Sequence, residues 1–152
     1  MRFTRNLTLF LILVCVTAAG EMSGVSAQAV FVRTPSNYNP QTGAFTLGET
    51  AYDGLYGKLC LTYDYFVFTA SGGQAVSWNV NSPGQVVYYF IIDANQLPYL
   101  NADAQNCYLN IPGPLHFFNS QTTLTWTPPV SGQYGLIFFT RVFYSGFIYV
   151  TS

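Results

Sequence analysis

The clearest pattern in the chain is a set of three apolar segments between residues 64 and 93, separated by clusters of turn-forming residues. In the middle segment, Val76, Trp78 and Val80 alternate with Ser77 and Asn79. A period of two is typical of a strand with one buried face and one solvent-exposed face. The turn clusters are residues 71–73 and 81–84. Three such strands in succession predict an antiparallel meander, and a meander this apolar requires a second layer to cover it.

The remainder of the chain shows further strand patterns. The longest candidate, residues 59–69, is apolar on both faces near its end, which predicts a central strand of a sandwich with an extra covering loop. Residues 44–51 are predicted to form an edge strand, and shorter runs predict strands at 29–32, 107–111, 115–118, 122–127, 133–142 and 146–151. The alternation places the largest aromatic side chains in the core, namely Phe66, Trp78, Trp126 and Phe138.

These patterns predict an all-β fold, an antiparallel β-sandwich of eight or nine strands within residues 45–152. Residues 28–44 are rich in turn formers, including Pro35 and Pro40, and are predicted to be an N-terminal extended segment. Residues 94–105 are the least strand-like part and have room for one helical turn.

The first 27 residues have the order of a secretory signal peptide. Arg2 and Arg5 precede an apolar run of 13 residues at 7–19, and a polar stretch ends at Ala27, where cleavage is expected. The run is shorter than the ~20 residues that span a bilayer. The alternative is an uncleaved membrane anchor. The sequence therefore predicts a protein that is secreted or held on the extracellular surface.

The composition limits the kinds of partner. Only 7% of the residues are charged, 18% are aromatic, and the formal net charge is −1. Such a balance gives no electrostatic basis for binding nucleic acid or an anionic membrane surface. A neutral surface rich in Tyr, Asn, Gln, Ser and Thr suits contact with other proteins, with glycans or with further copies of the chain.

The predicted mature chain contains two cysteines, Cys60 and Cys107. An even pair in an exported protein favours a disulfide, which would close a loop of about 48 residues. The alternative is two buried free thiols. We expect no metal site, because two cysteines and the single histidine, His116, are too few ligands and lack short spacing.

The sequence also argues against an enzyme and implies no cofactor. His116 has no recognisable nucleophile partner and is interpreted as a strand or loop residue. The five acidic residues after the signal are scattered, so nothing selects two of them as a glycosidase pair; they are Glu49, Asp53, Asp64, Asp93 and Asp103. Asp93, Asp103 and the 94–105 loop could hold Ca²⁺, and the alternative is that these side chains cap turns.

Aromatic residues are the better candidates for binding. Tyr88 and Tyr89 are neighbours on one predicted strand, so one of them must lie outward or beneath a loop. Phe143, Tyr144 and Phe147 lie at a predicted hairpin, where aromatic side chains need not be buried. Exposed rings can stack on sugars or pack against a partner, and the alternative is packing beneath a long loop.

Two stretches carry a resemblance to a known group. Residues 63–76 read Tyr-Asp-Tyr-Phe-Val-Phe-Thr-Ala-Ser-Gly-Gly-Gln-Ala-Val, and residues 124–136 read Leu-Thr-Trp-Thr-Pro-Pro-Val-Ser-Gly-Gln-Tyr-Gly-Leu. Together they resemble the extracellular jelly-roll sandwiches of the GOLD and bacterial pre-peptidase C-terminal type. The resemblance runs from residue 59 to the end of the chain. It implies a jelly-roll-like sandwich that is not an enzyme and that contacts other proteins or sugars.

Two functions follow as hypotheses. The first is a structural or protein-interaction module of the cell exterior that associates with itself, in which residues 29–32 pair with the edge of a neighbouring copy. The same residues could instead fold back on their own sheet. The second hypothesis is an extracellular carbohydrate-binding module, based on the resemblance and on the Tyr and Asn content of the loops.

Overall fold

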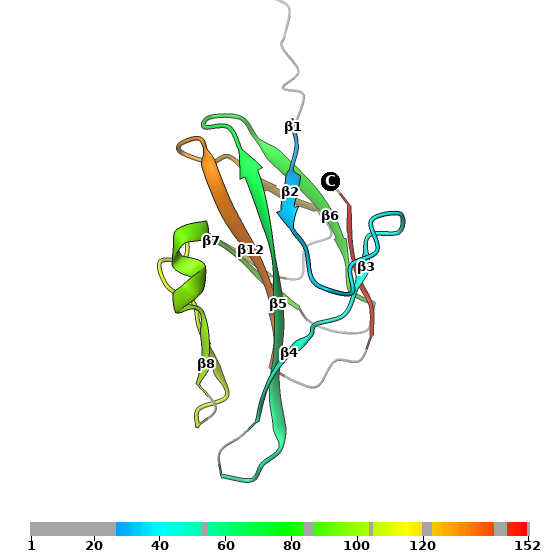
Figure 1. The fold of residues 1–152 in the computed structure, drawn as a ribbon, viewed down its shortest axis with the longest axis vertical. Helices are drawn as coiled ribbons and strands as arrows, with labels where there is room; N and C mark the ends of the chain where they lie inside the picture. Colours follow the sequence, from blue (N-terminus) through cyan, green and yellow to red (C-terminus); the bar gives the residue numbers. More distant parts are fainter. Residues whose placement is uncertain are drawn as a thin grey trace, which may run out of the picture.

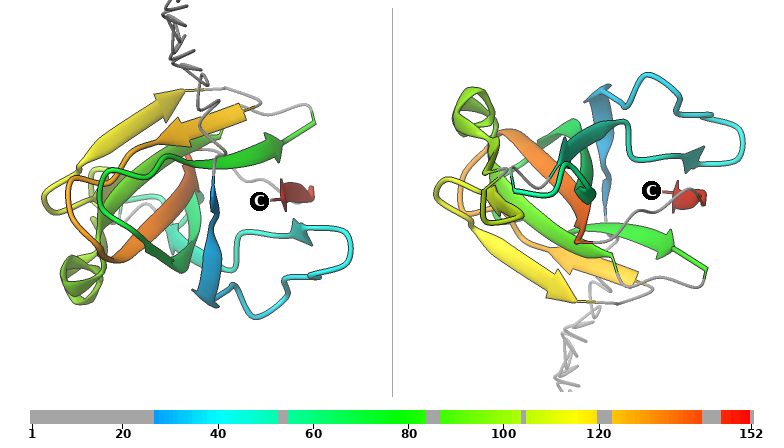
Figure 2. Two further views of the ribbon diagram at one scale, coloured as in Figure 1. Left: turned by 90° about the horizontal axis from the view of Figure 1, so that it is seen from above. Right: turned by 90° about the horizontal axis from the view of Figure 1, so that it is seen from below.

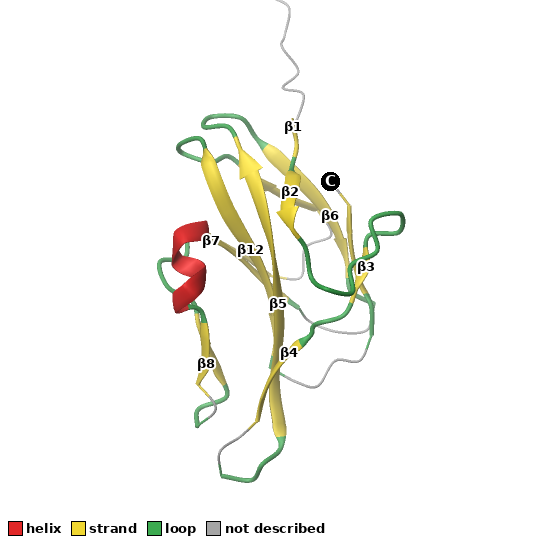
Figure 3. Ribbon diagram, in the orientation of Figure 1, coloured by secondary structure: helices red, strands yellow, loops and turns green. Residues whose placement is uncertain are grey.

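The chain folds into two β-sheets that pack face to face, as the computed structural model in Figure 1 shows. The structure describes residues 27–52, 55–83, 87–103, 105–119, 123–141 and 146–151. Strands dominate this part of the chain, and the one helical segment described is a 3₁₀ helix (Figure 3). The predicted all-β, antiparallel character is therefore confirmed.

Sheet A is built from strands of both chain halves. Its main path is β3 (Ala44–Phe45), β13 (Ile148–Thr151), β6 (Val76–Asn81) and β11 (Thr123–Trp126). A short strand, β1 (Ala27–Gln28), lies beside β6 where β13 ends.

Sheet B contains the longest strands. Its path is β10 (His116–Asn119), β7 (Tyr88–Asp93), β12 (Gly132–Thr140) and β5 (Leu59–Ala70). The outer side of β5 is shared by β2 (Val30–Arg33) at one end and β4 (Glu49–Tyr52) at the other. The predicted strand at 44–51 is thus two strands, since β3 lies at the edge of sheet A and β4 at the edge of sheet B.

The predicted meander over residues 64–93 is wrong. β5, β6 and β7 do follow one another, but β6 lies in sheet A while β5 and β7 lie in sheet B. The chain crosses between the layers at each turn, because the apolar inner face of β6 is buried by packing against the other sheet. Turn residues that end a strand look the same in a hairpin and in a crossover, so the pattern alone did not separate the two.

Aromatic rings from both sheets fill the space between the layers. Phe66 of β5 lies with its ring centroid 5.0 Å from that of Phe45 and 5.6 Å from that of Phe138, both in edge arrangements. Further along, Phe68 packs edge-on against Trp78 at 4.9 Å. Full burial of one such side chain contributes roughly 1.5–3 kcal/mol, so this cluster is a principal source of stability. The core positions predicted for Phe66, Trp78, Trp126 and Phe138 are confirmed.

A second, smaller core lies on the outer face of sheet B. It is covered by the 3₁₀ helix η1 (Ala94–Tyr99) and the hairpin of β8 (Asn101–Asp103) and β9 (Tyr108–Asn110). Residues 94–110 are called the flap below. Leu109 of the flap is 1% exposed and joins the cluster that contains Leu61, Ile92 and Ile137. The covering loop and the helical turn predicted from the sequence are both present.

A disulfide ties the flap to the sandwich. Cys60 of β5 is bonded to Cys107, the last residue of the turn between β8 and β9, and their Cα atoms are 5.6 Å apart. This distance lies in the usual range for a disulfide. The predicted Cys60–Cys107 pair is confirmed, and the alternative of two free thiols is not what the structure has.

The two motif turns, about sixty residues apart in the chain, pack against each other. The backbone N–H of Gly73 donates to the Pro128 carbonyl at 2.8 Å, and that of Gly72 donates to Ser131 Oγ at 2.9 Å. A Cβ on Gly72 would come within 2.8 Å of Val130 Cα, so this position requires glycine. The motifs therefore encode a contact between two turns of the fold.

The predicted signal peptide lies almost wholly outside the described residues, and β1 begins at its last residue, Ala27. Residues 28–44, predicted to be an extended segment ahead of the sandwich, contribute strands to both sheets. Among the described residues, no helix is long and apolar enough to cross a membrane.

Candidate interaction surfaces

The N-terminal segment of residues 27–33 adds strands to both sheets. β1 pairs in parallel with β6, and β2 pairs antiparallel with β5. Seen from above in Figure 2, this blue segment runs from β6 in one layer to β5 in the other. The apolar run at 29–32 therefore folds back on its own sheets, one of the two arrangements expected from the sequence.

Two side chains anchor this segment. Ala29, between β1 and β2, is buried, and the ring of Phe31 packs 4.8 Å from that of Phe66. The other side of the segment is open, since Val30 is 65% and Val32 53% exposed. At its end, the guanidinium of Arg33 lies 3.7 Å above the Tyr65 ring and donates to the Tyr65 carbonyl. A cation over an aromatic face is a favourable contact.

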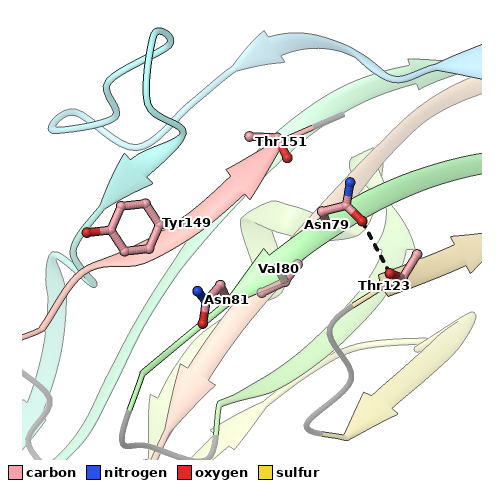
Figure 4. Close-up of a pocket in the computed structure, with 6 residues that line it drawn as sticks. All are labelled: Asn79, Val80, Asn81, Thr123, Tyr149 and Thr151. Atoms are coloured by element: carbon pink, nitrogen blue, oxygen red, sulfur yellow. Dashed lines mark hydrogen bonds between the residues drawn. The ribbon is translucent and has the colours of Figure 1, made fainter.

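A second surface is the polar outer face of sheet A, shown in Figure 4. Three strands supply one row of side chains across the sheet, with Thr123 paired to Asn79 and Thr151 on the other side of Asn79. The next row pairs Asn81 with Tyr149. Together these residues line a groove of about 390 Å³, the sixth lining residue being Val80. Such a volume falls within the roughly 300–1,000 Å³ of small-molecule sites.

The groove is neutral and has free hydrogen-bonding groups. None of its six lining residues is charged. Thr123 Oγ1 donates to Asn79 Oδ1 at 3.2 Å, which fixes that amide and leaves its N–H₂ group pointing away from this bond. Within the described part of the chain, no side-chain hydrogen bond is formed by Asn81, Tyr149 or Thr151. A neighbouring row continues the same chemistry, with Ser77 Oγ 2.9 Å from Thr125 Oγ1.

The third surface is an aromatic cluster on the outer face of sheet B. Tyr88 stacks on Phe139 with a centroid distance of 5.0 Å, and Phe90 lies 4.7 Å from Phe117. Phe117 is 49% exposed, whereas Phe139 is buried. The cluster adjoins the flap and is partly covered by it, so these rings serve mainly to pack the second core.

The aromatic residues selected from the sequence do not form one site. Tyr89 is 1% exposed and points into the core between the sheets, so it offers no surface to a ligand. Its neighbour Tyr88 lies on the outer face and is half-buried in the aromatic cluster. Phe147 is 56% exposed, and Phe143 and Tyr144 lie outside the described residues.

The acidic residues of the flap region act as turn caps. Asp93 accepts from the N–H of Asn95 at the start of η1, and Asp103 accepts from the N–H groups of Gln105 and Asn106. The side-chain hydrogen bond from Asn106 lowers the pKa of Asp103, and the backbone bonds act in the same direction. In the described part of the chain, no group of three or more His, Cys, Asp or Glu residues could hold a metal ion. Capping of turns by Asp93 and Asp103 is therefore what the described part of the 94–105 loop shows.

The contacts of His116 and Asp64 indicate structural roles for both residues. His116 is an exposed residue of β10 whose ring lies 4.4 Å from that of Phe118. Asp64 is 6% exposed, and its carboxylate accepts from the N–H groups of Tyr65 at 2.8 Å and Gly48 at 3.3 Å. Burial raises the pKa of Asp64, while those two hydrogen bonds and Arg33 act against the increase.

Comparison with known proteins identified no relative. No protein-family model matches the chain, no curated protein matches it, and no solved structure matches its fold.

Sequence reasoning missed the groove on sheet A, although part of its signal was visible. The polar positions of the alternating strand, Asn79 among them, predict a solvent-exposed face. The pattern does not show which strands lie beside this one, because β11 and β13 come from residues about 45 and 70 positions later in the chain.

Proposed function

We propose that this protein is an exported, non-catalytic β-sandwich that acts as a structural or protein-interaction module at the cell exterior. We further propose that copies associate by exchanging the N-terminal segment of residues 27–33. The observation that carries this proposal is the position of that segment. Eight other strands already form the main paths of both sheets, and β1 and β2 add to β6 and β5 from the chain's N-terminal side.

We also propose a jelly-roll topology for the sandwich, and the strand order supports it. One sheet runs β3-β13-β6-β11 and the other β10-β7-β12-β5. Along the chain, each main strand lies in the opposite sheet to the one before it, except β7 and β10, which are adjacent in sheet B. Such an alternation is expected of a jelly roll, in which eight strands form two Greek keys. The likeness to GOLD and pre-peptidase C-terminal domains is proposed on the sequence motifs alone.

Exchange of the segment would preserve its contacts. The backbone hydrogen bonds to β5 and β6, the burial of Ala29 and the packing of Phe31 on Phe66 are the same whether the segment comes from its own chain or from a neighbour. Because the same interactions form in both states, exchange of a terminal element is a low-cost route to association. Addition of a strand to a sheet edge is also a common mode of protein recognition.

The experiment is a mixed-chain disulfide test. Val30 lies directly opposite Thr69 in the β2–β5 register, and both side chains are exposed. A Val30→Cys chain and a Thr69→Cys chain, mixed and oxidised, will form a covalent heterodimer if the segment of one copy docks on the next. Val32→Cys is the matched control, since Val32 is similarly exposed but has no partner in this register.

Light scattering and electron microscopy of the purified mature protein complete the test. We expect assemblies larger than a monomer, which deletion of residues 28–36 will reduce in size. If the deleted protein keeps its molar mass and the cross-linked heterodimer forms no faster than with the Val32 control, strand exchange is wrong. A chain that is monomeric throughout would also remove the self-associating role.

A further inference from the structure

We infer that the outer face of sheet A holds a binding site for a neutral oligosaccharide. The site is the groove over β6, β11 and β13 that contains Asn79, Asn81, Thr123, Tyr149 and Thr151 (Figure 4). This site goes beyond self-association and does not depend on it, because strand exchange concerns the backbone pairing of β1 and β2, whereas the groove lies on a sheet face.

The chemistry of the groove selects the class of ligand. Side-chain amides both donate and accept hydrogen bonds, and hydroxyls do the same, which matches the hydroxyl groups of a sugar. An aromatic ring offers a flat apolar face to the C–H side of a sugar ring. Asn79 and Asn81 supply amides, Tyr149 supplies the ring, and two threonines supply hydroxyls.

The absence of charged side chains in the groove narrows the class of ligand further. The six lining residues carry no charge, and the row beyond them contributes Ser77 and Thr125. An acidic glycan, a phosphorylated ligand or a nucleic acid would need cationic groups to offset its own charge. A neutral oligosaccharide requires no such group, so its hydrogen-bonding pattern fits this surface better.

The strand geometry holds these groups in a fixed array. Asn79 and Asn81 are two residues apart on one strand, so their side chains leave the same face about 7 Å apart. Tyr149 lies directly opposite Asn81, and Ala44 follows on its other side. The small side chain of Ala44 leaves one flank of the Tyr149 ring without a bulky neighbour on that strand. Groups on paired strands move little relative to one another, so little entropy is lost on binding.

The test uses the folded mature protein and a defined panel of probes. The probes are maltohexaose, cellohexaose, xylohexaose, mannohexaose and chitohexaose, with a heparin hexasaccharide as the charged comparison. Binding is followed by the ¹H–¹⁵N NMR spectrum of the unmodified protein. We expect at least one neutral probe to shift the side-chain amide signals of Asn79 and Asn81, and heparin to leave them unchanged.

Substitutions then locate the site. Tyr149→Ala and Asn81→Ala should each weaken binding of the active probe about tenfold or more, as loss of a stacking ring or of a bound amide does. Tyr108→Ala is the matched control, because Tyr108 is an exposed tyrosine on β9, outside sheet A. It should leave the affinity unchanged, and near-ultraviolet circular dichroism will show that all three variants are folded.

Several results would overturn the inference. One is a folded protein whose spectrum responds to none of the neutral probes at millimolar concentration. Another is binding that shifts signals elsewhere and survives both groove substitutions. Binding of heparin alone would point to an electrostatic site, and a protein partner captured by this face with no sugar response would make the groove a protein interface.

Discussion

Asp64 places a carboxylate on the inner face of β5, where it is 6% exposed. Burial opposes the charged form, so the pKa of Asp64 in the folded protein is raised above the value in the unfolded chain. Between these two values the native state holds more protons than the unfolded state. The contribution of Asp64 to stability is therefore fully present at low pH and decreases as the pH rises through the folded pKa.

The raised pKa of Asp64 predicts how the stability difference between the wild type and the Asp64→Asn variant changes with pH. The difference in unfolding free energy, wild type minus variant, should fall as the pH increases from about 3 toward neutrality. Chemical denaturation at a series of pH values measures it. Asp103→Asn is the control. For this variant the same difference in unfolding free energy should rise with pH, because hydrogen bonds from Asn106 and Gln105 lower the pKa of Asp103. A difference for Asp64 that is flat or rises with pH would show that hydrogen bonds, not burial, dominate its pKa.

Tyr134 belongs to the motif at residues 124–136, and the fold explains why a tyrosine lies at this position. Its hydroxyl donates to the Val130 carbonyl four residues earlier, at 2.6 Å, and its ring packs 4.8 Å from that of Trp126. It therefore fixes the turn that leads into β12. The sequence indicated a turn at this place, but the bond from the tyrosine to that turn depends on the direction of the side chain, which alternation does not specify.

At the scale of elements, the flap is the part whose attachment to the sandwich can be tested directly. It packs on the outer face of sheet B through Leu109 and is held by the Cys60–Cys107 disulfide. Cys107 also has a positive φ of 50°, a conformation uncommon for residues other than glycine. The disulfide and the apolar contact through Leu109 therefore both hold the flap against sheet B.

We predict that Cys60→Ser combined with Cys107→Ser lowers the free energy of unfolding by about 4 kcal/mol in the chain-entropy description of a loop this long. Guanidinium unfolding of the oxidised protein and the variant measures this loss. Hydrogen exchange should show the change where the bond acts, with faster exchange over residues 94–110 and retained protection in β6 and β12. Uniformly faster exchange would mean that the flap and the sandwich form one cooperative unit.

Strand positions were more predictable than strand partners. The period-two pattern identified β6 and β11 closely, because one face of each is buried and the other is exposed to water. The apolar outer face of β5 indicated a covering segment, and the flap provides it. The predicted meander is wrong because the pairing of strands depends on which sheet the chain enters after each turn. The groove was missed for the same reason, since its rows join strands far apart in the chain.

Across the whole molecule, the low content of charged residues favours association through backbone hydrogen bonds and apolar contacts over association through ion pairs. Only 7% of the residues are charged and the formal net charge is −1, so Coulomb terms between copies are small. Contacts of the N-terminal segment are mainly backbone hydrogen bonds, a buried alanine and the tilted ring pair of Phe31 and Phe66, and Arg33 adds a charged contact with Tyr65. Neither backbone hydrogen bonds nor apolar contacts are screened by salt in the way that ion pairs are.

We therefore predict that the molar mass distribution of the mature protein changes little between about 10 mM and 500 mM sodium chloride, a range over which the Debye length falls several-fold. Ammonium sulfate should instead shift the distribution toward larger assemblies, because excluded salts strengthen apolar burial. Light scattering in both series measures the two effects, and the chain lacking residues 28–36 is the control. If sodium chloride alone dissolves the assemblies, ion pairs between copies hold them together. In that case the arginine at the end of β2, Arg33, would replace the buried residues of the segment as the group to alter first.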